Sequence, residues 1–436
     1  MNHLARSRAG RGLAVAICVA MLVSCATTQL PPISASGSQF EPTSDEVALW
    51  QAAREEEQKL RDEANLYHDP LLEDYLEDIV SRLNPPGMSA NPEIGYRVSV
   101  IEDPTLNAFA YPHGSLYVHT GLLARMDNEA QLATVLAHEM THVENRHLLR
   151  QQRAQRNRAI AFSAAAIAAA IWVAGEQGEA LEEGDYSRAA RIDVLSDVLV
   201  GLGLQLAFVA TVNGYGRELE READYGGMSK ISDAGYDVGE ADDVFVKLKE
   251  SSPPRSDLEV FFFGSHPQLE ERIENTREWQ ATHRVSEGSK SPAQPKRFDE
   301  RMRPVVRDNA VLNIELGRLG LAEQDLERAR QAMPDDPRTL MLFGRLRLAK
   351  AEKAANDEER RSLREAAMDA YREALSRDDT LAEPHRELGL HAYRLDRPRE
   401  ACEHMRRYLK LSPRDAEDRR AIEDYVRDLE RSGHCP

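Results

Sequence analysis

The chain is short of positive charge. Its 436 residues include 56 Lys and Arg against 74 Asp and Glu, so the formal net charge is −18 at pH 7. Proteins that bind nucleic acids or anionic membranes through electrostatic attraction need a basic surface, and this balance argues against both classes. We therefore expect no nucleic-acid partner.

Cysteine is scarce, with four residues in the whole chain. Cys18 and Cys25 lie near the N-terminus, and Cys402 and Cys435 lie near the C-terminus. No nucleophile motif surrounds either C-terminal cysteine, which argues against thiol catalysis. In an exported chain these two can form a disulfide that holds the tail. Spacing alone leaves open whether their Cα atoms come close enough.

Long apolar runs of the kind that a membrane-spanning helix requires are also missing from the middle of the chain. The segment 159–174 is short and rich in alanine, and the segment 194–212 is interrupted by Asp197 and Gln205. We expect both to form amphipathic helices that are buried or face a membrane, with transmembrane helices as the alternative.

The N-terminus has the pattern of an export signal. Three arginines precede an apolar run from Leu13 to Val23, and the tetrapeptide Leu-Val-Ser-Cys ends at Cys25. This tetrapeptide resembles a bacterial lipobox, in which cleavage precedes a lipid-bearing cysteine; a plain cleaved signal is the alternative. We predict a signal peptide over 1–24 and a Pro/Ser-rich tether over 25–44. The absence of Asp after Cys25 favours the outer membrane.

The motif HEMTH carries the most specific chemistry in the sequence. On a helix, which turns about 100° per residue, His138 and His142 face the same side and can hold one Zn²⁺ between two neutral imidazoles. Glu139 can take a proton from a water that the metal activates and deliver it to a leaving amine. Asn128, followed three residues later by a glutamine, has the form of a capping box.

A catalytic zinc needs a third protein ligand. The acidic segment 216–227 offers one, although an ordinary solvated helix is the alternative. Glu220 and Asp224 are four residues apart and share a helix face, so Glu220 can complete a His₂Glu site while Asp224 accepts the N–H of a ligand histidine. Glu218 and Glu222 are rival ligands on spacing alone.

Four motifs in order resemble the family of HtpX, the CAAX prenyl proteases and the bacterial periplasmic BepA proteins. They are NAFAYPHGSLYVHTGLL (107–123), HEMTH, the ExEAD pattern, and SHPQLEERI (265–273). The resemblance covers residues 45–282. It implies an α+β metallopeptidase domain of gluzincin type, mostly helical with a small sheet and one Zn²⁺ per chain.

The resemblance also implies roles for single residues. The first Glu of ExEAD is the family's zinc ligand, which corresponds to Glu220, and the Asp corresponds to Asp224. In BepA-type members the histidine at His266 approaches the zinc as a regulatory fourth ligand; stabilisation of an oxyanion is the other role open to it. Near Asn107–Tyr117 we expect an edge strand that pairs with substrate. The Tyr-Pro-His sequence at 111–113 departs from the family's usual turn.

Beyond residue 282 the composition changes to a linker (283–304) and then to a helical segment (305–436). Small and large residues recur there in the pattern of the second helix of a tetratricopeptide repeat. The aligned sets are Ala322, Leu326 and Ala329; Ala367, Tyr371 and Ala374; and Ala401, Met405 and Tyr408. We predict an all-α repeat domain that binds partner proteins in a concave groove.

Taken together, these features predict a zinc-dependent endopeptidase of the periplasm, attached to the outer membrane by a lipid on Cys25. The resemblance implies quality control or assembly of outer-membrane proteins. Its partners would be misfolded or stalled outer-membrane proteins and, through the repeats, the barrel-assembly machinery. The alternative function is that of a chaperone or scaffold with a largely repressed protease site.

Overall fold

A computed structural model describes residues 30–89, 94–157, 215–251, 269–283 and 295–435. The chain divides into two compact units, Met1–Gln294 and Pro295–Pro436, and each is described by itself. Several predicted features lie outside the described residues: the signal peptide with Cys25, the apolar segments 159–174 and 194–212, and His266.

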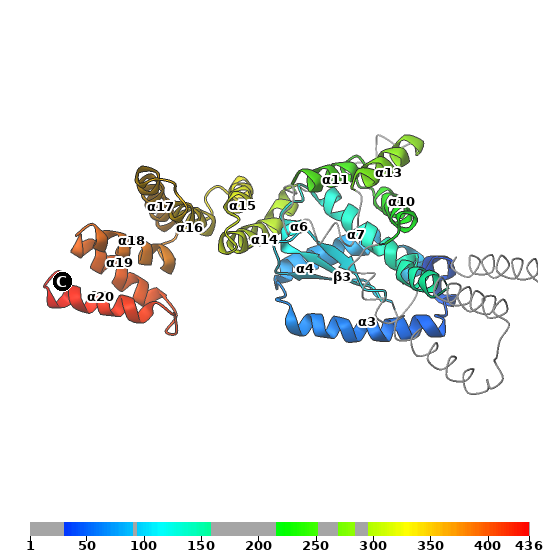
Figure 1. The fold of residues 1–436 in the computed structure, drawn as a ribbon, viewed down its shortest axis with the longest axis horizontal. Helices are drawn as coiled ribbons and strands as arrows, with labels where there is room; N and C mark the ends of the chain where they lie inside the picture. Colours follow the sequence, from blue (N-terminus) through cyan, green and yellow to red (C-terminus); the bar gives the residue numbers. More distant parts are fainter. Residues whose placement is uncertain (1–29, 90–93, 158–214, 252–268, 284–294, 436) are drawn as a thin grey trace, which may run out of the picture. The chain divides into compact units, whose positions relative to one another are not determined.

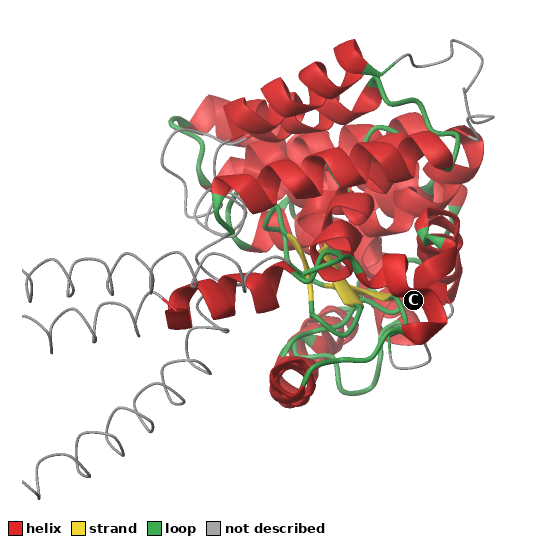
Figure 2. Cartoon of the chain, turned by 90° about the vertical axis from the view of Figure 1, so that its right-hand side faces the viewer, coloured by secondary structure: helices red, strands yellow, loops and turns green. Residues whose placement is uncertain are grey.

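The first unit is mostly helical and contains a small sheet (Figure 1, Figure 2), which confirms the predicted fold class for this unit. Residues 147–157 are also helical. The bounds of its described helices are α2 (Ile33–Ser36), the 3-10 helix η1 (Gly37–Gln39), α3 (Ser44–Glu63), α4 (Pro70–Leu83), α5 (Pro86–Ser89), α6 (Thr120–Leu123), α7 (Glu129–Glu144), α10 (Arg217–Asp233), α11 (Glu240–Ser251) and α13 (Leu269–Thr282).

The described sheet has three strands in the order β1-β3-β2. Strand β1 (Arg97–Ile101) runs parallel to β3 (Ser115–His119), and β2 (Ala108–Ala110) runs antiparallel to it. The β2–β3 turn requires Gly114, whose φ is +103° and whose added Cβ would lie 2.8 Å from the carbonyl oxygen of Gly95. Strand β2 thus lies at an edge, within the segment where an edge strand was predicted.

The outer edge of β2 carries backbone groups that do not pair with β3. The carbonyl of Asn107 accepts from β3, and the N–H of Tyr111 donates to β3. Backbone hydrogen bonds alternate in direction from one residue to the next along a strand. The N–H and C=O of Phe109 therefore also point toward β3, whereas those of Ala108 and Ala110 point toward the outer edge. None of the described strands pairs with that edge.

Helix α3 lies on the opposite side of the sheet from α7 (Figure 1, Figure 2). Its Glu57 accepts a hydrogen bond from the Tyr117 hydroxyl at 2.7 Å and lies 2.7 Å from His113 Nε2. Burial raises the pKa of Glu57, but hydrogen bonds from His113, Tyr117 and Ser115 outweigh it and lower that pKa to about 2. The unusual turn at 111–113 therefore supplies a buried histidine that connects the sheet to α3.

The described part of the predicted tether is packed against the first unit. Ile33, in α2, is 1% exposed, and Ser34 donates a hydrogen bond from its hydroxyl to Glu144. An added Cβ at Gly87 would lie 2.1 Å from the carbonyl oxygen of Ser34. The predicted boundary at residue 44 was wrong, because burial of Ile33 fixes this stretch to the domain.

Two glycines allow α10 to approach α7 closely. An added Cβ at Gly226 would lie 2.4 Å from Thr141 Cγ2, and one at Gly227 would lie 3.3 Å from the backbone nitrogen of His138. Any larger residue at Gly226 would push the two helices apart. The close packing brings Glu220, in the first turn of α10, beside the HEMTH motif.

Helix α7 is buried along nearly its whole length. Its N-cap is the predicted Asn128, whose side chain accepts from the backbone N–H of Gln131 at 3.0 Å. The predicted capping box is incomplete, because the Gln131 side chain accepts from the N–H of Asp127 instead. This cap fixes where the helix begins and so sets the direction in which its histidines point.

The second unit is all-α. Consecutive helices pack against each other as α14 with α15, α16 with α17, α18 with α19, and α19 with α20. The bounds are α14 (Pro295–Glu315), α15 (Leu319–Ala332), α16 (Pro337–Glu352), α17 (Asp357–Arg377), α18 (Ala382–Arg394), α19 (Pro398–Leu411) and α20 (Arg419–Arg431). Because α14 begins at Pro295, residues 295–304 are helical and do not form the predicted linker.

All nine aligned residues of the predicted repeats are buried, with exposures of 0–4%. They lie on α15, α17 and α19, the second helix of each pair. A glycine on the first helix accommodates the large residue of the set: an added Cβ at Gly344 would lie 2.7 Å from Tyr371, and one at Gly389 would lie 2.8 Å from Met405. The small–large–small pattern thus describes how the helices of a pair pack.

A disulfide joins Cys402 on α19 to Cys435 beyond α20. It lies beside a buried cluster that includes Met405, Ile422 and Val426. The disulfide that spacing left open therefore holds the C-terminal tail against the last helices.

Within the described part of the chain, no helix combines the length and apolar character that crossing a membrane requires.

Candidate metal centre

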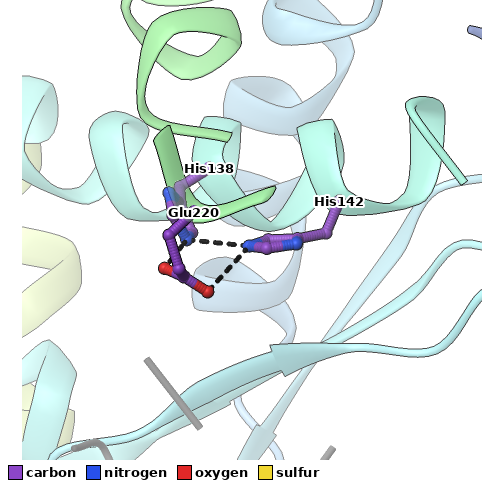
Figure 3. A group of neighbouring side chains, drawn as sticks. All are labelled: His138, His142 and Glu220. Carbon is purple, nitrogen blue, oxygen red and sulfur yellow. Dashed lines mark hydrogen bonds and ion pairs between the residues drawn. The ribbon is translucent and has the colours of Figure 1, made fainter. Parts of the chain in front are cut away.

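The three predicted metal ligands lie together in the first unit (Figure 3). His138 and His142 project from α7, and Glu220 projects from α10. The Nε2 atoms of the two histidines are 3.0 Å apart. Glu220 Oε2 lies 3.5 Å from His138 Nε2, and Oε1 lies 3.6 Å from His142 Nε2. All three side chains are buried, with exposures of 2–5%.

These separations suit a single Zn²⁺. Tetrahedral bonds of about 2.0–2.1 Å place ligand atoms about 3.3 Å apart, close to all three observed distances. Two imidazoles and one carboxylate are also a donor set of catalytic zinc sites, which keep a fourth position for water or substrate. Among the described residues this is the one group of three or more potential ligands that lie close enough to share an ion.

A buried polar cluster supports His138 from the side away from Glu220. Asp224 Oδ1 lies 3.1 Å from His138 Nδ1. Asp224 in turn accepts from Arg272 Nε at 3.0 Å and from Asn275 Nδ2 at 3.1 Å. Arg272 is 2% exposed, and its guanidinium lies over the ring of Phe245. Asp224 thus has the position expected of an acceptor for a ligand histidine.

Two opposing effects act on His138. Burial and the charge of Arg272 lower its pKa, but hydrogen bonds to Asp224 and Glu220 outweigh them, so the pKa is raised overall. The carboxylates that would orient His138 toward a cation therefore also favour its protonated form when no cation is bound.

His142 has its own supporting residues. Its Nδ1 lies 2.9 Å from Nδ1 of His147, and Nε2 of His147 lies 3.3 Å from Glu222 Oε2. Arg150 donates to both carboxylate oxygens of Glu222. The hydrogen bond from His147, together with Arg150, lowers the pKa of Glu222 to about 2 despite partial burial.

An aromatic ring covers His142 on another side. Tyr215 stacks on it with ring centroids 4.0 Å apart and planes inclined by 19°. Burial, and then the negative charges of Glu139 and Glu220, raise the pKa of Tyr215 well above its ordinary value. Glu139 itself is buried, at 3% exposure. The general base predicted from the motif therefore lies in the same buried region as the ligands.

A small pocket that opens to solvent adjoins the ligands. His142 forms part of its wall, and Ala110 of the edge strand β2 forms another part. The rest of the wall is largely apolar and includes Leu49, Trp50, Pro112, Val143, Leu148, Leu149 and Tyr215. The pocket thus lies between the metal-ligand cluster and strand β2.

The structure separates the rival acidic residues of α10. Glu218 is exposed to solvent, and Glu222 is paired with Arg150 and His147 at a distance from the ligand cluster. Arg272 and His147 were not predicted as site residues. Arg272 stands within the SHPQLEERI motif, which is the one signal in the sequence that could have identified it.

Comparison with known proteins gives a consistent result. Residues 70–280 match the model of peptidase family M48. A candidate β-barrel assembly-enhancing protease of Vibrio cholerae is 31% identical over 225 residues, which cover 50% of this chain and 41% of that protein. The β-barrel assembly-enhancing protease of Escherichia coli K12 is 30% identical over 224 residues, with the same shares.

A eukaryotic relative is similar over a stretch of comparable length. The mitochondrial metalloendopeptidase OMA1 of Schizosaccharomyces pombe is 29% identical over 216 residues, which cover 49% of this chain and 54% of that protein. The matched stretch thus spans about half or less of each relative. Residues 70–280 thus match peptidase family M48, and the chain is similar over about half its length to β-barrel assembly-enhancing proteases.

Proposed function

We propose that this protein is a zinc-dependent endopeptidase of the periplasm, attached to the outer membrane, that acts in the quality control or assembly of outer-membrane proteins. The observation that carries this proposal is the buried cluster of His138, His142 and Glu220 within a family M48 domain. Ligand separations of 3.0–3.6 Å support one zinc ion per chain.

The proposed chemistry follows from the residues around the cluster. A bound Zn²⁺ supplies Lewis acidity, which polarises a peptide carbonyl and makes a water molecule more acidic. Glu139 takes the proton of the attacking water and passes it to the leaving amine. Asp224 and His147 hold the two ligand histidines in place. The buried setting strengthens each of these electrostatic interactions.

The proposed substrate is an extended polypeptide. The peptide groups of Ala108 and Ala110 point away from β3, but these residues are 0% and 8% exposed, so an added strand could pair with them only after the groups that cover them move aside. A substrate side chain next to the cleaved bond would contact the largely apolar wall between β2 and His142. An unfolded or stalled membrane protein offers both an unpaired backbone and apolar side chains.

The proposed location and partners rest on the N-terminal sequence and the relatives. The lipobox-like tetrapeptide ending at Cys25 supports a lipid anchor in the outer membrane. The relatives from Vibrio cholerae and Escherichia coli are named for enhancing β-barrel assembly. The helix pairs of the second unit, which we propose are tetratricopeptide repeats, would bind outer-membrane proteins or the barrel-assembly machinery.

We propose that His266 regulates the site as a fourth zinc ligand, an assignment that rests on the family resemblance. Bound there, the imidazole would occupy the position that the attacking water needs. Replacing His266 with Ala should then raise proteolysis, including self-cleavage, while the zinc content measured by atomic absorption stays near one per chain. A fall in activity of about 10²-fold with zinc intact would instead assign His266 to the oxyanion.

The deciding experiment compares the wild type with Glu139→Gln. We expect both proteins to bind zinc and only the wild type to cleave casein, because the substitution removes the base but no ligand. Equal cleavage by both would exclude the proposed mechanism. In cells, a Glu139→Gln strain that behaves like the wild type would favour the alternative function, a chaperone or scaffold whose protease site is largely repressed.

A further inference from the structure

His147 lies outside the ligand set, yet it is the most buried histidine near the metal centre, with 0% exposure. It contacts His142 on one side and Glu222 on the other, at 2.9 Å and 3.3 Å. We propose that His147, backed by Glu222 and Arg150, is a positioning residue that sets the tautomer of the ligand His142. This inference rests on the proposed binding of zinc.

One assignment of protons satisfies every contact in this chain of residues. To bind an ion through Nε2, His142 must carry its proton on Nδ1, which then donates to Nδ1 of His147. His147 must therefore be neutral and carry its own proton on Nε2, which donates to the carboxylate of Glu222. A protonated or reversed His147 would place two N–H groups face to face and would remove the acceptor that His142 needs.

The backbone supports this arrangement. In an uninterrupted helix, a residue five positions after His142 would point about 140° away from it. Helix α7 ends at Glu144, and Arg146 takes a left-handed conformation with φ of +57°, so the chain turns before His147. Arg146 is fixed there by a hydrogen bond from its Nε to Glu46 at 2.7 Å.

The carboxylate at the far end of the chain is also held. Arg150, which lies in the same helical stretch as His147, donates Nη2 to Glu222 Oε1 at 2.9 Å. Glu222 comes from α10, the helix that also carries Glu220. The arrangement therefore connects the two elements that supply the metal ligands, in addition to orienting His142.

The test measures zinc affinity by competition with a chelator, using the full chain and four variants. His147→Leu and Glu222→Ala each remove one hydrogen-bonding group, whereas His147→Gln keeps an acceptor facing His142. Glu218→Ala is the matched control, because it removes the same charge from an exposed position on α10. Apo-protein melting is recorded for each variant, so that loss of fold is separated from loss of affinity.

We expect zinc affinity to fall 10- to 100-fold in His147→Leu, about 10-fold in Glu222→Ala, and less in His147→Gln than in His147→Leu. Glu218→Ala should bind within twofold of the wild type. In ¹⁵N spectra of the zinc-bound wild type, His142 should carry its proton on Nδ1. If His147→Leu does not fold, Glu222→Ala and His147→Gln decide the question.

Zinc binding within twofold of the wild type in every folded His147 variant and in Glu222→Ala would overturn the proposal, as would an equal loss in Glu218→Ala. Failure of the proposed function would look different, since the wild type would then bind no zinc or would bind it independently of His138 and His142. The wild-type measurement reveals the first of these outcomes, and the same measurement on His138→Ala and His142→Ala reveals the second.

Discussion

At the residue scale, two glutamates of α10 that lie close together in sequence have different partners. Glu220 is the carboxylate of α10 that meets both ligand imidazoles, and its side chain is 5% exposed. Burying a charged carboxylate without a partner costs free energy of folding. The Glu220 carboxylate is therefore stabilised when a cation or a protonated histidine faces it. Glu222, only two residues away, is compensated by Arg150 instead.

This difference predicts unequal effects of two alanine substitutions on zinc content. Glu220→Ala removes one of three protein ligands, so zinc affinity should fall by more than 10²-fold and the purified protein should contain far less than one zinc per chain. Glu222→Ala removes only a supporting contact and should retain most of its zinc when zinc is in excess. Equal zinc content in the two variants, measured by atomic absorption, would contradict the ligand assignment.

The buried Glu57 predicts a dependence of stability on pH. Its folded-state pKa of about 2 lies below the ordinary value of 4.5, so its contribution is present above pH 4.5 and is lost as the pH falls through 2. At pH 7 we expect the free energy of unfolding of Glu57→Gln to be about 1.5–3 kcal/mol lower than that of the wild type, because hydrogen bonds to a charged acceptor are lost.

The measurement is urea unfolding of both proteins between pH 7 and pH 2. The gap between wild type and Glu57→Gln should narrow steadily below pH 4.5. Glu55→Gln, an exposed change on the same helix, should show almost no gap at any pH. A gap of the same size at pH 7 and pH 3 would mean that the carboxylate charge is not what connects α3 to the sheet.

At the element scale, the site depends on how closely α7 and α10 pack. The HEMTH helix supplies two ligands by its own periodicity, but the third ligand reaches them only because Gly226 and Gly227 let the backbones approach. Of the two hydrogen bonds of the predicted capping box, only the one from the Gln131 N–H to the Asn128 side chain forms, because the Gln131 side chain accepts from Asp127 instead. Helix α7 nevertheless begins directly after Asn128, as the sequence predicted.

The close approach predicts that Gly226→Ala is destabilising, by about 1–3 kcal/mol, because the new methyl group would overlap the side chain of Thr141. Zinc affinity should fall with it as α10 moves away from α7. Thermal unfolding with and without zinc would show both effects. Adding Thr141→Ser, which removes the nearest methyl carbon, should recover part of the loss.

Gly320→Ala serves as the control for this change. It lies in a helix, and an added Cβ there has no neighbour within 4 Å. Because alanine is the better helix former, we expect a neutral to slightly stabilising effect of up to about 1 kcal/mol. If Gly226→Ala behaved like Gly320→Ala, close helix packing would not be what positions Glu220.

At the scale of the whole molecule, the chain consists of two compact units, and the sequence of the first begins with the pattern of a lipoprotein signal. The units differ in how they are stabilised. The first has a sheet with helices on both sides, whereas the second consists of helix pairs and ends in a disulfide between Cys402 and Cys435. That disulfide is consistent with an oxidising compartment.

The proposed lipid anchor predicts where the protein is found after cell fractionation. Cys25→Ser should move the protein from the membrane fraction to the soluble periplasmic fraction, because a serine cannot carry the thioether-linked lipid. The check is immunoblotting of both fractions after a high-salt wash. A mutant that stays with the membrane would point to the segment 159–174 or 194–212 as the anchor.

Local pattern was enough to predict several parts of this protein. Helical spacing places His138 and His142 on one face whatever the rest of the fold does, because the rise and turn of a helix are set by the backbone. The same holds for the recurring Ala322, Ala367 and Ala401, which are buried where each helix pair meets. Each of these features can be recognised from the spacing of residues within a single helix.

Only the tertiary structure decided the remaining choices, because they depend on contacts between distant segments. Spacing alone allowed Glu218, Glu220 and Glu222, and the family resemblance pointed to Glu220; the close packing of α10 on α7 is what brings Glu220 to the histidines. Arg272 reaches Asp224 across 48 positions of sequence, and no local periodicity records such a pair. His147 meets His142 because the chain breaks its helix at Arg146, which changes the direction of every side chain that follows.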